Sequence, residues 1–127
     1  MTRDAFKIER GRIERTLNML ERSSDQLLAG LPVPTSVLRD AVAFLRATED
    51  AAYEDARKED GSLALAGCVE EHVSARVPLA GMENALRELA AGNRSAAAPF
   101  AKSARDYVTL WREHVRADDR LLGRQDH

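Results

Sequence analysis

The segment PFAKSARDYVTLWREHVRADDRLL, residues 99–122, decides the fold class of this chain. Its inner stripe recurs every seven residues and consists of Phe100, Tyr107, His114 and Leu121, widened by Leu110 and Trp111. A seven-residue repeat keeps side chains on one face of an α-helix, so the segment predicts a long amphipathic helix. His114 occupies a position in this stripe that is otherwise apolar.

Three earlier segments have the same helical spacing, and turn residues separate them. We expect helices over approximately residues 3–29, 35–59, 62–91 and 95–122. No stretch alternates polar and apolar residues as a strand does. Short connections between long amphipathic helices favour antiparallel neighbours. The sequence therefore predicts one all-α domain over residues 1–127, an antiparallel up-down-up-down four-helix bundle.

Pro78 lies inside the third predicted helix. A proline in a helix interior removes one backbone hydrogen bond and clashes with the preceding turn, at a cost of about 3 kcal/mol. We therefore expect a kink within residues 74–81, or two shorter helices in place of one.

The composition excludes several classes of protein. The formal net charge is −2, with 44% hydrophobic and 31% charged residues, which is typical of a globular domain with no electrostatic bias toward nucleic acid or anionic membranes. No apolar run is long enough for a membrane span or a signal peptide. Cys68 is the single cysteine, so no internal disulfide can form. These features predict a cytoplasmic protein that binds neither nucleic acid nor membranes.

Polar residues interrupt the inner stripes of all four predicted helices. This polar layer comprises Arg10, Tyr53, Glu54, Glu59, His72, Arg76 and His114. One member on each helix lies about 21 residues from a turn shared with a neighbouring helix, which corresponds to about 32 Å along a helix axis. In an antiparallel bundle such residues meet at one level, so we expect the layer to lie at one end of the bundle.

Two interpretations of the layer are open. Four-helix bundles hold metals with His and carboxylate side chains from facing helices, and these ligands suit iron, manganese or zinc. The same residues could instead form a hydrogen-bonded network that satisfies buried polar groups. Arg10 and Arg76 favour the network, because guanidinium groups repel a metal cation.

Four segments of the chain resemble the hemerythrin-like, or HHE cation-binding, family. They are GRIERTLNMLE (11–21), AVAFLRATEDAAYEDARKED (41–60), EEHVSAR (70–76) and YVTLWREHVRADDRLL (107–122). The resemblance implies a four-helix bundle with a non-haem di-iron centre. Members of the family bind oxygen, sense oxygen or redox state, store iron or help to repair iron centres. By this resemblance His72, His114 and Asp119 occupy ligand positions, and Asp118 is the neighbour of Asp119.

The chain departs from the family pattern in two helices. Arg10 stands where the family has its first-helix histidine, and AAYED (51–55) replaces the second-helix motif. We therefore expect a hemerythrin-like bundle without a cofactor, in which Arg10 and Arg76 neutralise the remaining carboxylates. Such a bundle would be a non-catalytic binding, regulatory or interaction module. The alternative is a cation-binding protein that holds iron, zinc or another divalent metal with His72, His114, Asp119 and a second-helix carboxylate.

No motif predicts an enzyme. The chain has no Ser-His-Asp order, glycine-rich phosphate loop or HExxH spacing. Tyr107 and Trp111 are expected to be core aromatic residues. A homodimer, a protein partner seated on apolar residues such as Val37, and a small ligand in the bundle cavity near Arg10 and Arg76 all stay open as binding functions.

Overall fold

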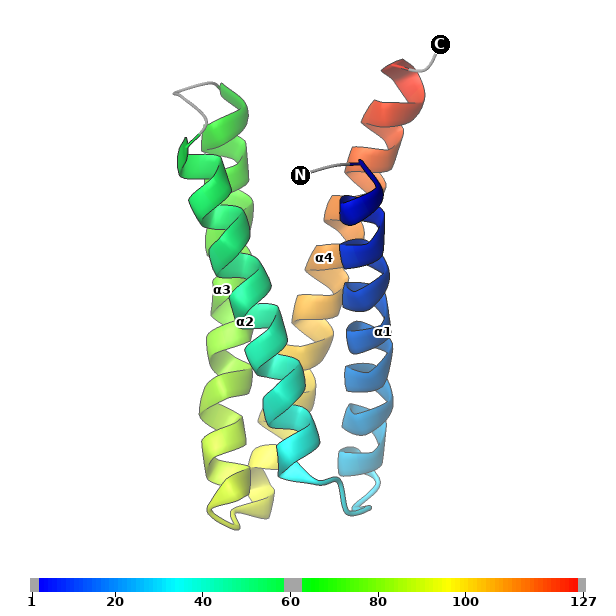
Figure 1. Ribbon diagram of the computed structural model, residues 1–127. Helices are drawn as coiled ribbons and strands as arrows, with labels where there is room; N and C mark the ends of the chain where they lie inside the picture. The colour runs from blue at the N-terminus through cyan, green and yellow to red at the C-terminus, as the bar shows by residue number, and fades with distance from the viewer. Residues whose placement is uncertain (1–2, 59–62, 126–127) are drawn as a thin grey trace.

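The computed structural model describes the backbone of residues 3–58 and 63–125 and the side chains of residues 10–51 and 75–114. Its elements are α1 (Arg3–Leu28), α2 (Thr35–Lys58), α3 (Leu63–Ala90), the short 3-10 helix η1 (Arg94–Ala96) and α4 (Ala97–Gln125). Throughout these residues every regular element is a helix, which confirms the predicted all-α fold with four helices (Figure 1). None of the described helices is long and apolar enough to cross a membrane.

Successive helices run in opposite directions along the bundle (Figure 1). α3 packs against both α2 and α4, and α1 packs mainly against α4. The contact between α1 and α2 is much smaller than any of these three. The α1–α2 seam is therefore the weakest lateral contact in the bundle.

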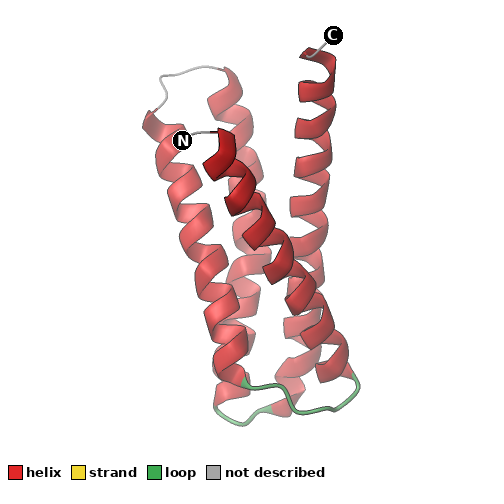
Figure 2. Cartoon of the chain, turned by 45° about the vertical axis from the view of Figure 1, so that its right-hand side comes forward, coloured by secondary structure: helices red, strands yellow, loops and turns green. Residues whose placement is uncertain are grey.

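Two turns at one end of the bundle follow the ends of α1 and α3 (Figure 2). After α1, Gly30 takes a φ of 76°, and the Leu31 N–H donates to the Gln26 carbonyl over 2.9 Å. After α3, Gly92 takes a φ of 93°, and the Asn93 N–H donates to Glu88 in the same way. Glycine adopts this left-handed conformation without steric cost, which is why it terminates both helices.

The core is a layer of aliphatic and aromatic side chains contributed by all four helices. Its fully buried members are Leu17, Leu20, Leu38, Leu45, Leu79, Met82 and Phe100, each with no exposed surface. Leu17 and Leu20 belong to one face of α1, as the spacing of three residues requires. Tyr107, whose hydroxyl contacts a polar group described below, belongs to the same core cluster.

α3 is one continuous helix with Pro78 inside it, so the expected alternative of two shorter helices is wrong. Pro78 is buried, and its neighbour Leu79 has no exposed surface. One backbone hydrogen bond is lost at a proline, and the packing of this turn against the core compensates for that loss. The fourth helix also differs from expectation, since it continues through Gly123 to Gln125.

Gly81 sets how closely α3 approaches α4. A Cβ atom built on Gly81 would lie 2.3 Å from the Ser103 Oγ and 3.2 Å from the Ser103 Cβ. Gly81→Leu is therefore expected to lower the free energy of unfolding by about 1–2 kcal/mol, because an overpacked interface must separate. Chemical denaturation measures this change.

Gly11 provides the matched control for the Gly81 substitution. A Cβ atom on Gly11, which lies in α1, meets no atom within 4 Å. Gly11→Leu should therefore stabilise the protein by up to about 1 kcal/mol through helix propensity alone. Equal effects at the two positions would contradict the close approach of α3 and α4.

Candidate functional site

Most residues of the predicted polar layer lie outside the part of the chain whose side chains are described, namely Tyr53, Glu54, Glu59 and His72. Asp118 and Asp119, which the family resemblance adds, lie outside it as well. Arg10, Arg76 and His114 are the three members with described side chains, and all three are half-buried. Two of the three are cations, and His114 alone among them can ligate a metal.

Arg76 forms an ion pair with a carboxylate that the sequence pattern does not place in the layer. The Arg76 Nη2 lies 3.4 Å from the Asp50 Oδ1, so this pair joins α3 to α2. The side chains are 39% and 55% exposed, respectively. The pair therefore stands at the edge of the bundle, where solvent weakens it.

A buried carboxylate lies one residue before Asp50 on α2. Glu49 is only 6% exposed, and the Tyr107 hydroxyl on α4 donates a hydrogen bond of 2.8 Å to its Oε1. Tyr107 itself is 1% exposed. A buried carboxylate needs such donors, because its desolvation would otherwise cost several kcal/mol.

Arg46 lies one turn before Glu49 and binds a carboxylate on α3. Its Nε donates to the Glu83 Oε2 over 3.2 Å, and its Nη2 donates to the Glu83 Oε1. This two-point geometry suits a planar guanidinium. We call Arg46, Glu49, Glu83 and Tyr107 the Glu49 cluster; it links α2, α3 and α4.

The charges of the Glu49 cluster act on one another. The hydrogen bond that Arg46 donates to Glu83 raises the pKa of Arg46 above its usual value, burial opposes this, and the negative charges of Glu83, Asp50 and Glu49 raise it further. Burial is the main cause that raises the pKa of the Tyr107 hydroxyl, and the charge of Glu49 adds to it. Tyr107 therefore stays a neutral donor throughout the physiological range.

The sequence pattern misses Glu49 because two continuations fit the helical spacing after Leu45. Leu38, Ala41 and Leu45 follow the inner face of the second helix and are buried, as their spacing indicates. The spacing then allows either Thr48 or Glu49, and the pattern favours Thr48. In the structure Thr48 is half-buried, and its hydroxyl donates to the Phe44 carbonyl over 2.9 Å. The buried residues on the described part of α2 include Ala41 and the row Leu38, Val42, Leu45 and Glu49. The 4-3-4 spacing of that row is itself a helical signal that could have identified Glu49.

Tyr107 is buried as a core aromatic residue should be, but its hydroxyl has a polar role. A buried tyrosine requires a hydrogen-bond partner, and Glu49 is that partner. Trp111, one turn later on α4, is partly buried and packs against the core. The sequence therefore predicts that Tyr107 and Trp111 pack in the core, but it does not predict that Tyr107 binds Glu49.

Within the Glu49 cluster, protein donors bind the carboxylates, and none of its side chains is an activated nucleophile. Each carboxylate in it accepts a hydrogen bond from a protein donor. Among residues 10–51 and 75–114, no three His, Cys, Asp or Glu side chains come together in a way that could hold a metal ion. In this part of the molecule the arrangement suits structural or binding roles. Comparisons of the chain with protein-family models, curated proteins and solved structures find no match.

Proposed function

We propose that this protein is a hemerythrin-like bundle that has lost most of its di-iron ligands and acts as a non-catalytic binding, regulatory or interaction module. The observation that carries the proposal is the ion pair between Arg76 and Asp50. Arg76, which the sequence assigns to the polar layer, binds a carboxylate on α2. Arginine cannot lose its proton in a protein, so it cannot become a metal ligand.

The Glu49 cluster supports the same interpretation. Arg46 and Tyr107 supply the donors that Glu83 and Glu49 accept. These contacts give Glu49 and Glu83 protein donors in place of a cation. The Glu49 cluster and the Arg76–Asp50 pair thus fit a network of polar and charged side chains better than a di-iron centre.

Metal analysis of protein purified without a chelator tests this proposal. We expect iron, zinc and manganese each well below one equivalent per chain, because the charge balance is met by arginines. Protein incubated with ferrous iron under nitrogen and then desalted should give the same result. Stoichiometric iron in either preparation would contradict the proposal.

The rival function is cation binding by a reduced ligand set of His72, His114, Asp119 and a second-helix carboxylate. It requires that His72→Ala and His114→Ala each abolish metal uptake. Arg94→Ala, in η1 at the other end of the bundle, is the control that should leave any uptake unchanged. Metal bound by the parent protein and lost in both histidine variants would establish the rival.

A further inference from the structure

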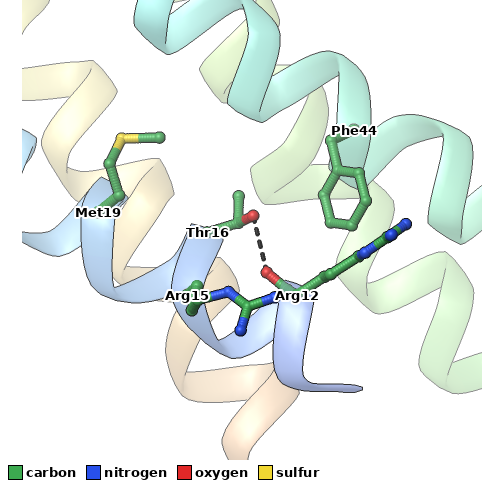
Figure 3. A pocket seen from close by; sticks show the side chains of 5 residues that line it. All are labelled: Arg12, Arg15, Thr16, Met19 and Phe44. Carbon is green, nitrogen blue, oxygen red and sulfur yellow. Dashed lines mark hydrogen bonds between the residues drawn. The ribbon is translucent and has the colours of Figure 1, made fainter. Parts of the chain in front are cut away.

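The weak seam between α1 and α2 leaves an open groove on the surface of the bundle. Its lining is Arg12, Arg15, Thr16, Met19 and Phe44, and its volume is about 440 Å³ (Figure 3). Four of these side chains come from two turns of α1, and the Phe44 ring points toward α1 from α2 (Figure 3). The groove is shallow and open, so it cannot enclose a small molecule as a binding pocket does.

The floor of the groove is apolar and incompletely covered. Met19 and Phe44 pack against the core but are only partly buried. The Thr16 hydroxyl donates to the Arg12 carbonyl over 2.9 Å, so this polar atom is already bound within α1. Val37, seven residues before Phe44, is 41% exposed and extends the apolar row along α2. Seven residues of helix span about 10.5 Å, which is two turns.

One wall of the groove carries positive charge that the described part of the protein does not neutralise. Arg12 and Arg15 are exposed, and no described carboxylate lies within ion-pair distance of either. The opposite seam of α1 differs, because Arg105 binds Asp25 and Arg112 binds Glu21 there. Uncompensated arginines therefore gather on the α2 side of α1.

Two further charges on this face offset each other. Arg22 follows Arg15 by seven residues on α1, and Asp40 precedes Phe44 by one turn of α2. Both are exposed, and together they add no net charge. The described residues of this face therefore keep the two positive charges of Arg12 and Arg15.

The apolar floor and the positive charge of the groove indicate which kind of partner it would bind. A second copy of the chain is disfavoured, because a two-fold contact would bring the arginines of both copies together. A nucleic acid would need a longer basic track with aromatic side chains for stacking. An amphipathic helix fits, since its apolar residues two turns apart match the spacing of Val37 and Phe44. Acidic residues beside those anchors would match Arg12 and Arg15.

We infer that the groove between α1 and α2 binds an acidic amphipathic helix of another protein. The apolar anchors of that helix rest on Phe44 and Met19, and its carboxylates bind Arg12 and Arg15. This inference rests on the proposed function as an interaction module and names the chemistry of its partner. It requires no contact with the polar layer.

Two matched peptides of about 20 residues, each roughly 30 Å long as a helix, test the inference. Both carry leucine at anchor positions seven residues apart; one has glutamate beside the anchors and the other has lysine. Fluorescence anisotropy should show that the glutamate peptide binds at least about tenfold more tightly. In a titration followed by NMR, the backbone amides of residues 12–19 and those around Phe44 should shift. Equal affinities, or shifts confined to another face, would overturn the inference.

Variants locate the contact. Arg12→Glu with Arg15→Glu should weaken binding of the glutamate peptide at least about tenfold, and Phe44→Ala should weaken both peptides. Arg94→Glu is the control, since Arg94 is an exposed arginine in η1, away from the groove. Circular dichroism melting verifies that each variant is folded. Parent-like binding by the double variant would contradict the inference.

Two further measurements separate this inference from its rivals. Vesicles that contain anionic phospholipid should not retain the protein, and strong retention without peptide selectivity would assign the groove to a membrane surface instead. Metal content is measured on the same preparations. Selective peptide binding by protein that holds stoichiometric iron would overturn the proposed function but leave the groove assigned. Metal-free protein that binds both peptides equally would overturn the inference about the groove but leave the proposed function standing.

Discussion

Tyr107→Ala is expected to lower the free energy of unfolding by about 3–5 kcal/mol, the usual cost of removing a fully buried aromatic ring. Tyr107 is 1% exposed, and its hydroxyl is hydrogen-bonded to the buried Glu49. The loss therefore combines a cavity with the removal of the hydrogen bond that Tyr107 donates to Glu49. Urea denaturation of parent and variant at neutral pH measures the difference.

Tyr107→Phe measures how much of that loss in the free energy of unfolding comes from the hydrogen bond alone. It keeps the ring and removes the donor, and should cost about 1.5–3 kcal/mol because the acceptor is charged. Combining it with Glu49→Leu removes both partners, which is often nearly neutral for a buried pair. The double variant should therefore be more stable than the sum of the two single losses predicts. Strict additivity would show that Tyr107 and Glu49 do not interact.

Alkaline conditions should destabilise the protein through the same hydroxyl. Burial and the charge of Glu49 raise the pKa of Tyr107 in the folded state, whereas the pKa of an unfolded tyrosine is about 10. Above pH 10 the unfolded chain therefore loses this proton first, and stability falls as the pH rises. While the hydroxyl stays protonated in the folded state, the loss approaches about 1.4 kcal/mol per pH unit. Below pH 10 this contribution is fully retained.

Comparison with Tyr107→Phe assigns the alkaline loss to one residue. The variant keeps Tyr53, the other tyrosine in the chain, and every lysine. Its stability should decline less steeply between pH 10 and 12 than that of the parent, by up to the same 1.4 kcal/mol per pH unit. Parallel curves for the two proteins would refute the assignment.

The fold class was predictable because helical periodicity is a local property. The seven-residue spacing that joins Phe100 to Tyr107 requires no knowledge of the neighbouring helices. The two glycines that end α1 and α3 are equally local signals, since each supplies a positive φ. Pro78 was harder, because its effect depends on how well the surrounding turn packs. Its burial in a continuous α3 is a tertiary outcome.

The polar site was less predictable, because the position of a polar residue on one helix does not indicate which residue of another helix it contacts. The sequence assigns Arg76 to the layer, but the carboxylate that it binds, Asp50, lies on another helix and is not part of the predicted layer. Glu49 was missed because the helical spacing after Leu45 fits Thr48 as well, and a glutamate is rarely buried unless a donor faces it. That donor, Tyr107, is 58 residues away in the sequence.

The unequal packing of α1 has a consequence for how the protein is made. Its main partner is α4, the last helix in the chain, and not the neighbouring α2. A ribosome that adds roughly 5–20 residues per second delivers α4 only several seconds after α1. Throughout that interval the apolar face of α1, with Leu17 and Leu20, lacks the surface that buries it in the finished bundle. Synthesis itself therefore sets a period in which the first helix is open to capture by chaperones or to aggregation.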